Sequence, residues 1–178
     1  MSTIFLVAIK EELDAPLELS GNVIYTGVGK IAAAIAATQV CVKYGKRLAR
    51  IINLGTAGSF DGNLKGINRC GTFIDRDYSY LTNKSTTFSF NDGLTLSTGD
   101  SFCTSIDQKN HGSITADLAD MEAYAIAKTC WYFNVDFDCY KYVTDYIGVD
   151  SENDWKTRVA EGKQYFLEII RDNIKNSV

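Results

Sequence analysis

The sequence predicts an α/β protein whose sheet is largely parallel or mixed, and three observations support this prediction. Segments with strand character alternate with segments of helical period. The first apolar run, at residues 4–9, shows no polar alternation, which is typical of a strand buried on both faces. No repeat, low-complexity tract or linker interrupts the chain, so we expect one domain over residues 1–178, long enough for a hydrophobic core.

The first third of the chain contains three predicted strands and one predicted helix. The strands are expected at residues 4–9, 23–26 and 50–54. The alanine-rich segment 31–44 predicts a buried helix, and Gly45 suits the position just after its end. The third strand leads into Gly55-Thr56-Ala57-Gly58-Ser59, which we expect to be a glycine-rich turn at the strand's carboxyl end.

The rest of the chain continues the alternation of strands and helices. Further strands are expected at residues 71–77, 86–90, 94–98 and 137–143. Asn91-Asp92-Gly93 separates two of them and predicts a β-hairpin. Residues 117–130 begin strand-like and then take a helical period. Ser151 and Asn153 are candidate N-caps of a final helix. Its apolar stripe comprises Trp155, Val159, Phe166, Ile169, Ile170 and Ile174.

Composition disfavours several classes of protein. Hydrophobic residues make up 46% of the chain and charged residues 22%, as in ordinary globular proteins. The net charge of −4 argues against a nucleic-acid partner. The N-terminus lacks a basic leader and no apolar run reaches membrane-spanning length. We therefore expect a soluble, cytoplasmic protein that binds neither nucleic acid nor membrane.

The cysteines and the single histidine argue against disulfides and metal. The five cysteines are widely separated and odd in number, which fits buried, reduced thiols. His111 is the one histidine, so a zinc site of the usual kind has few ligands to draw on. We expect no metal and no cofactor.

Familiar nucleotide and hydrolase motifs are absent or incomplete. Gly27-x-Gly29-x-x-Ala32 follows a strand and opens a helix, but no acid follows at the end of the next strand, so a tight turn is favoured over a dinucleotide site. The sequence has neither P-loop spacing nor a G-x-S-x-G motif.

What remains is a set of carboxylates at predicted strand ends. Glu12, Asp120, Glu122 and Asp145 lie beside glycine-containing turns. Carboxylates without metal or histidine suit glycosyl chemistry, in which one acid protonates the leaving group and another handles water.

Four motifs, in this order, resemble those of the purine nucleoside phosphorylase/nucleosidase superfamily. They are Ile51-Ile52-Asn53-Leu54-Gly55-Thr56-Ala57-Gly58, Thr98-Gly99-Asp100-Ser101-Phe102, Asp120-Met121-Glu122-Ala123 and Val143-Thr144-Asp145. The resemblance extends over most of the chain, from residue 4 to about 148, and is strongest to the 5′-methylthioadenosine/S-adenosylhomocysteine nucleosidases. It implies a three-layer fold with a mixed, mostly parallel sheet flanked by helices, a purine nucleoside as ligand, and a homodimer or larger assembly.

The resemblance also implies roles for the acids. Glu12 matches the acid that holds and activates the attacking water, and Asp145 matches the acid that protonates N7 of the departing purine. We expect burial and the neighbouring acids Glu122 and Asp120 to raise the pKa of Asp145. Met121 and Glu122 match the pair that contacts the ribose, with Glu122 bonded to its 2′- and 3′-hydroxyls.

The remaining matches concern the base and the residues behind the water site. Phe102 and Cys103 match the segment that stacks on the base and offers it backbone hydrogen bonds. Thr56 matches a serine near the water and the sugar, and Thr144 stands where the family usually has serine.

Three departures from the family pattern stand out. Lys141 replaces an arginine that steadies the water site, and Asp120 replaces a glutamate. The segment between Gly58 and Gly99 is shorter than in full-length members, which leaves the 5′-substituent open. The motif segments contain no evident Arg/Lys cluster, which disfavours a nucleotide substrate, although Arg76 and Lys84 leave that alternative open.

The sequence leaves four hypotheses for the function, and hydrolysis is the favoured one. It is favoured over phosphorolysis because Glu12 beside a phosphate dianion would be repulsive. The third hypothesis is a nucleoside-binding protein without activity, and the fourth is an unrelated α/β binding module.

Overall fold

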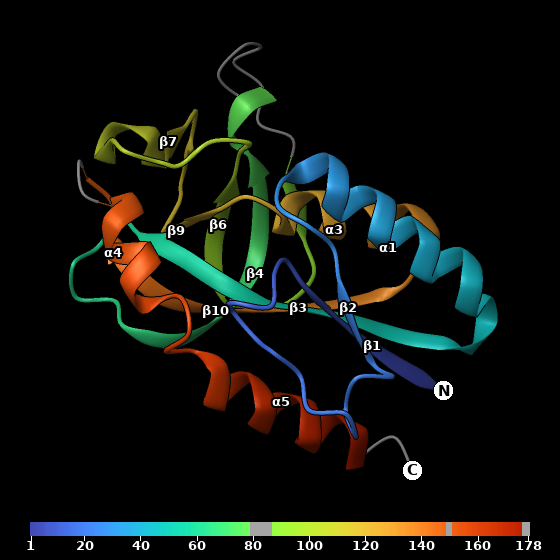
Figure 1. Cartoon of the computed structure of the whole chain (residues 1–178). Coiled ribbons are helices and arrows are strands. Elements are labelled where there is room, and N and C mark those ends of the chain that lie inside the picture. Colours follow the sequence, from blue (N-terminus) through green and yellow to red (C-terminus); the bar gives the residue numbers. More distant parts are fainter. Residues whose placement is uncertain (79–86, 149–150, 176–178) are drawn as a thin grey trace.

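The computed structural model describes residues 1–78, 87–148 and 151–175, and within them the chain forms a mixed sheet with helices on both faces (Figure 1). The strands of the main sheet are β1 (Ser2–Val7), β2 (Val23–Tyr25), β3 (Leu48–Ser59), β4 (Gly66–Asp75), β5 (Thr87–Ser89), β6 (Leu94–Thr98), β9 (Leu118–Asp120) and β10 (Asp136–Tyr146). The helices are α1 (Lys30–Tyr44), α3 (Ala123–Phe133), α4 (Ser151–Arg158) and α5 (Lys163–Lys175). The chain also contains two short 3-10 helices, η1 (Gly45–Arg47) and η2 (Ile106–Lys109), and a small pair of strands, β7 (Asn110–His111) and β8 (Ile114–Thr115).

The long strand β3 organises the sheet. One edge of β3 pairs in parallel with β1 and then, at Gly58 and Ser59, antiparallel with β9. Its other edge pairs in parallel with β10 along almost its whole length. β10 also pairs with β4, β4 with β6, and β6 with β9, so the strands β3, β10, β4, β6 and β9 close into a ring. β1 and β2 extend the sheet outward from β3. The predicted mixed α/β sheet is confirmed, with antiparallel β10–β4, β3–β9 and β4–β5 pairs among its parallel ones.

Alternate side chains of β1 enter two different cores, as expected of a strand buried on both faces. Ile4 and Leu6 belong to the core beneath α1 and α3, whereas Phe5 and Val7 belong to the core over α5. Figure 1 shows α1 and α3 together on one side of the sheet and α5 on the other.

Helix α1 is half-buried rather than buried as expected. Its alanines at 33, 36 and 37 face the core together with Val40 and Cys41. Ile31, Ile35 and Val42 are exposed. Small side chains of α1 thus face α3 and the core, and the large apolar side chains of α1 lie on its outer face.

The expected hairpin around residues 91–93 is wrong. β5 and β6 do not pair with each other; both pair with the same residues of β4, one along each edge. The connection crosses over β4 at Gly71, where a β-carbon would overlap the carbonyl oxygen of Asn91. The Asn91 side chain then donates to the Phe137 carbonyl on β10 at 2.9 Å, which fixes the crossing. Residue 86 of the expected strand lies outside the described residues.

The expected final helix is two helices. α4 ends at Arg158 and α5 begins at Lys163, and Gly162 between them leaves room for Tyr142 and Phe166. Phe166 and Ile170 of α5 are core residues, as predicted. Trp155 of α4 lies elsewhere, in the pocket described below.

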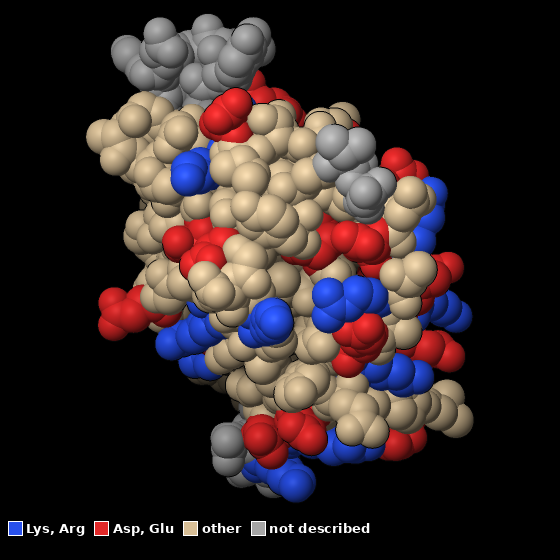
Figure 2. Space-filling model, turned by 90° about the vertical axis from the view of Figure 1, so that its left-hand side faces the viewer, with Lys and Arg blue, Asp and Glu red and all other residues tan. Residues whose placement is uncertain are grey.

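Two further observations concern the surface and the helices. On the face shown in Figure 2, acidic and basic side chains of the described residues are interspersed rather than gathered into one broad patch. Within the described part of the chain, every helix is too short or too polar to cross a membrane.

Candidate functional site

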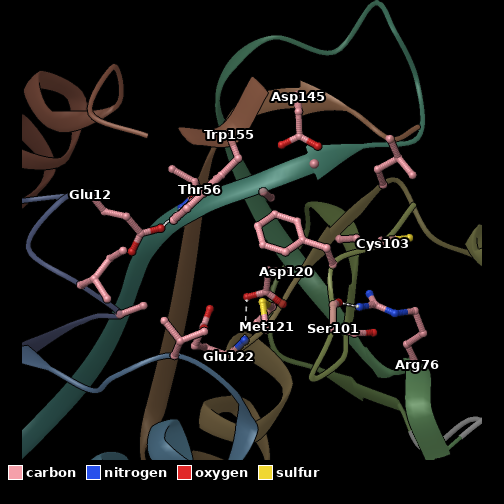
Figure 3. Close-up of a pocket in the computed structure, with 18 residues that line it drawn as sticks. Glu12, Thr56, Arg76, Ser101, Cys103, Asp120, Met121, Glu122, Asp145 and Trp155 are labelled. Carbon is pink, nitrogen blue, oxygen red and sulfur yellow. Dashed lines mark hydrogen bonds between the residues drawn. The ribbon is translucent and has the colours of Figure 1, made fainter. Parts of the chain in front are cut away.

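A pocket lies beside the point where β3 pairs with β9, and most of the residues singled out from the sequence line it (Figure 3). Eight of the ten predicted site residues line it, namely Glu12, Thr56, Phe102, Cys103, Asp120, Met121, Glu122 and Asp145. Lys141 and Thr144 lie behind its wall, fully buried. The loop after β1, the strands β3 and β10, the segment after β6 and the β9–α3 junction thus converge on one cavity.

Glu12 is held by β3 through one of its two carboxylate oxygens. The backbone N–H and the hydroxyl of Thr56 both donate to Oε1, each at 2.7 Å. The other oxygen, Oε2, is buried and accepts no hydrogen bond from the residues that the structure describes. Burial raises the pKa of Glu12, while Lys141, Thr56 and the Ala8 amide oppose the shift. Such a carboxylate has one oxygen fixed and one available for a proton.

Asp145 lies on the opposite wall, on β10. The Thr144 hydroxyl donates to its Oδ1 at 2.8 Å, so Thr144 orients the acid from behind. Burial is the main cause that raises the pKa of Asp145, and the charge of Asp154 on α4 adds to it. The shift has the predicted direction, but its charge contribution comes from Asp154 rather than from the expected Glu122 and Asp120.

Glu122 occupies the floor of the pocket next to Met121, at the start of α3. The backbone N–H of Gly29 donates to its Oε1 at 2.9 Å, which ties the floor to the turn before α1. Gly29 has a φ of 93°, so the tight turn predicted at Gly27 and Gly29 is confirmed. Burial, followed by the charge of Asp120, raises the pKa of Glu122 to about 8. Near neutral pH this side chain therefore holds a proton that it can donate to a bound oxygen.

Asp120 and Lys141 form a buried ion pair rather than a free binding surface. Lys141 Nζ lies 2.9 Å from Asp120 Oδ2, and both side chains are 1% exposed. Asp120 also accepts from the Thr98 hydroxyl at 2.6 Å and from the amide of Ala123 at 2.9 Å, so both its oxygens are engaged. The acid predicted at the helix N-terminus thus caps α3 and fixes the junction that carries Glu122.

The glycines of β3 make room for the charged side chains. Residues 55–59 continue the strand through Ser59 instead of forming the expected turn. A β-carbon at Gly55 would lie 3.1 Å from Lys141 Nζ and 3.2 Å from Glu12 Oε1, and one at Gly58 would lie 2.7 Å from Asp145 Oδ2. These glycines therefore allow charged side chains to approach the strand closely. In a sequence, a glycine with this role cannot be distinguished from a glycine in a turn.

The segment after β6 forms the remaining wall. Arg76 holds it through its guanidinium, which donates to the carbonyls of Ser97 and Ser101 at 3.2 and 2.7 Å. Phe102 lines the pocket, and its ring meets that of Trp155 edge to face with centroids 5.7 Å apart. Arg76 thus supports the wall, and Lys84 lies outside the described residues.

Sequence reasoning misses the roles of two pocket residues, Arg76 and Trp155. In the sequence, Arg76 serves only to leave a nucleotide substrate open, and its role in holding backbone carbonyls leaves no trace there. The spacing of Trp155 fits a core stripe and so predicts the wrong place for it. The break between α4 and α5 at Gly162 is the signal that could have separated it from that stripe.

Comparisons with known proteins identify similar chains. No family model matches the sequence. The 5′-methylthioadenosine/S-adenosylhomocysteine nucleosidase of Staphylococcus aureus (strain bovine RF122 / ET3-1) is 29% identical over 162 residues, covering 71% of this chain and 69% of the relative.

Solved structures share the fold over nearly the whole chain. A futalosine hydrolase mutant of Helicobacter pylori strain 26695 superposes with a TM-score of 0.82 at 16% identity, over 97% of this chain and 100% of that one. A 5′-methylthioadenosine/S-adenosylhomocysteine nucleosidase from Colwellia psychrerythraea 34H, in complex with adenine, gives a TM-score of 0.75 at 18% identity, over 89% and 88% of the two chains.

Proposed function

We propose that this chain is a member of the nucleoside phosphorylase/nucleosidase superfamily and that it hydrolyses the N-glycosidic bond of a purine nucleoside. The proposed substrate is a 5′-substituted adenosine of the methylthioadenosine/S-adenosylhomocysteine type, and the products are adenine and the ribose moiety. The observation that carries the proposal is Glu12, whose Oε2 is buried without a hydrogen bond from the described residues, in a pocket that also contains Asp145.

Glu12 acts on the attacking water in this proposal. Thr56 occupies Oε1 with two hydrogen bonds, so Oε2 is the oxygen that accepts the proton from water. The raised pKa of Glu12 brings it toward neutrality, where a general base is most effective. The ionised form is the active one, so activity falls as the pH falls through this pKa.

Asp145 acts on the leaving group. A purine anion leaves poorly, and protonation at N7 allows the C–N bond to break. The raised pKa of Asp145 favours the protonated form that this step needs. Activity therefore falls again as the pH rises through that pKa, which gives a bell-shaped profile.

The remaining pocket residues position the nucleoside. Glu122, protonated near neutral pH, hydrogen-bonds the ribose hydroxyls, and Met121 packs on the sugar. Phe102 stacks on the base, and Cys103 offers backbone hydrogen bonds to it. No metal or cofactor is needed for these steps. Lys141 and Thr144 act from behind the pocket wall, on Glu12 and Asp145, and Asp120 holds the junction that carries Glu122.

Water is the proposed nucleophile because the proposed base, Glu12, acts in its anionic form. Glu12 lines the pocket, and the nearby cation Lys141 is engaged by Asp120. A phosphate dianion there would meet the Glu12 carboxylate without a free counter-charge from Lys141.

The test is to incubate the protein with a panel of purine nucleosides, with and without phosphate, and to quantify free base. Release of adenine in phosphate-free buffer is the expected result. Release that requires phosphate would identify a phosphorylase. Tight binding without release would identify a nucleoside-binding protein.

We also propose a homodimer in the cytoplasm and a three-layer arrangement in which the sheet is the middle layer. The outer face of α1 and α3 carries the exposed side chains Ile31, Ile35, Val42 and Tyr132. A second copy would cover this apolar surface. Light scattering at micromolar concentration checks it, and a clean monomer mass would reject it. The cytoplasmic location is supported by five cysteines that are free and buried.

A further inference from the structure

Trp155 lies over the pocket, away from the core stripe that its spacing predicts. It stands on α4 and lines the cavity together with Thr56 and Phe102. Its ring is partly buried and packs edge to face on Phe102. The contact with Phe102 buries part of the apolar ring of Trp155, and the indole N–H has a separate partner.

The indole N–H connects Trp155 to the proposed general base through one residue. Trp155 Nε1 donates to Thr56 Oγ1 at 2.9 Å, and Thr56 Oγ1 lies 2.7 Å from Glu12 Oε1. An indole N–H can only donate, whereas a hydroxyl has one proton and two acceptor lone pairs. Thr56 must therefore accept from Trp155, and its single proton is directed to Glu12. These hydrogen bonds run in one direction only, from the indole to the carboxylate.

Helix α4, which carries Trp155, is fastened at its far end as well. Arg158 Nη1 donates to the carbonyl of Thr144 at 2.7 Å, next to Asp145. At its start, the Ser151 hydroxyl accepts from the Gly148 amide at 2.7 Å. The indole is thus held by a helix that is fixed at both ends, and it does not depend on the nucleoside for its position.

We propose that Trp155 is a positioning residue for hydrolysis, which fixes the Thr56 hydroxyl so that Glu12 Oε1 is permanently occupied and Oε2 alone faces the water. The inference rests on the proposed function. Without the indole N–H, the Thr56 hydroxyl can rotate away from Glu12, and the carboxylate loses part of the stabilisation of its ionised form.

Trp155→Phe removes the N–H and keeps an aromatic ring against Phe102. We expect kcat to fall about 3- to 10-fold, the range for loss of one neutral hydrogen bond, with KM nearly unchanged. The acidic limb of the kcat profile should move to higher pH by about 0.5–1 unit, because the anion of Glu12 is less stabilised. Trp131→Phe is the matched control, since Trp131 is the other tryptophan, is 64% exposed on α3 and does not line the pocket. This control should leave kcat, KM and the pH of the acidic limb unchanged.

A double-mutant cycle tests the path through Thr56. Thr56→Val should itself shift the acidic limb upward, and adding Trp155→Phe should then have no further effect. Additive effects, or a Trp155→Phe variant that changes KM with an unshifted limb, would overturn the proposal and leave Trp155 as a wall of the pocket.

Infrared titration of the Glu12 carboxyl gives a readout that needs no turnover. The band is assigned by its loss in Glu12→Gln, and its midpoint should rise in Trp155→Phe but not in Trp131→Phe. A wild-type protein that releases no base from any nucleoside would refute the proposed function, whereas an unshifted midpoint in an active Trp155→Phe variant would refute this inference alone.

Discussion

Lys141→Met removes the buried cation that lies between Asp120 and Glu12, and its cost can be worked from the structure. The Lys141 side chain is 1% exposed and its Nζ lies 2.9 Å from Asp120 Oδ2. Truncating one partner of a buried pair typically costs about 3–5 kcal/mol, because the remaining charge stays buried. Asp120 keeps its bonds from Thr98 and the Ala123 amide, which places the expected loss near the lower end, about 3 kcal/mol. For a chain of this size that corresponds to a fall in Tm of about 6–12 °C.

The assay is urea unfolding at pH 7 with Lys156→Met as the matched control. Lys156 pairs with Glu152 at 2.7 Å on α4, but both side chains are 57% exposed, so its loss should cost at most about 0.5 kcal/mol. Adding Asp120→Asn to Lys141→Met should recover part of the stability, since the unpaired charge is removed. Equal unfolding midpoints for Lys141→Met and Lys156→Met would refute the reasoning.

The same substitution should alter the pH dependence of activity. The positive charge of Lys141 lowers the pKa of Glu12 against the effect of burial. Removing it raises that pKa further, so the base is lost at a higher pH and the acidic limb of the kcat profile moves upward. An unmoved limb in a folded Lys141→Met protein would show that Glu12 is not the titrating base.

Three further outcomes are expected. Glu12→Gln should abolish most turnover while nucleoside binding, measured by calorimetry, stays nearly intact, because the amide cannot accept the proton; an unchanged rate would transfer the role to another acid. Asp145→Asn should slow cleavage of purine nucleosides at least about 10²-fold but spare a 4-nitrophenyl riboside, whose leaving group needs no proton; equal losses on both substrates would make Asp145 structural. Glu122 has a pKa raised from 4.5 to about 8, so the folded state binds a proton that the unfolded chain releases, and stability should fall as pH rises across that range. Glu122→Gln should flatten this fall in urea unfolding at pH 5 and 8.5, and an unchanged slope would contradict the assignment.

The acids of the site could be predicted because local patterns place them. The apolar run before Lys10 indicates a buried strand, so Glu12 had to lie near a strand end. The change from strand to helix period around Met121 likewise locates Asp120 and Glu122 at a helix N-terminus. In the structure, these acids line one pocket.

The contacts behind the site could not be predicted because they join distant segments. Lys141 meets Asp120 across the ring of strands, and nothing within either segment specifies the partner. The turn expected at Gly55 and Gly58 is wrong because a glycine that admits a side chain and a glycine that turns the chain look alike in a sequence. The place expected for Trp155 is wrong because its spacing satisfies a stripe that the break before α5 divides.

The closed ring of strands has a consequence for the order in which the protein folds. The seam between β3 and β10 joins residues 50–59 to residues 136–146, so it closes a loop of about half of the chain. Contacts of such large sequence separation form late, because the entropy of loop closure must be overcome before they stabilise anything. Thr56 and Asp145 lie on the two strands of this seam, and Glu12 is bound to one of them. These side chains therefore come together only when the seam forms, and competence for binding should appear in a refolding experiment together with the slowest protection of the β3 and β10 amides from hydrogen exchange.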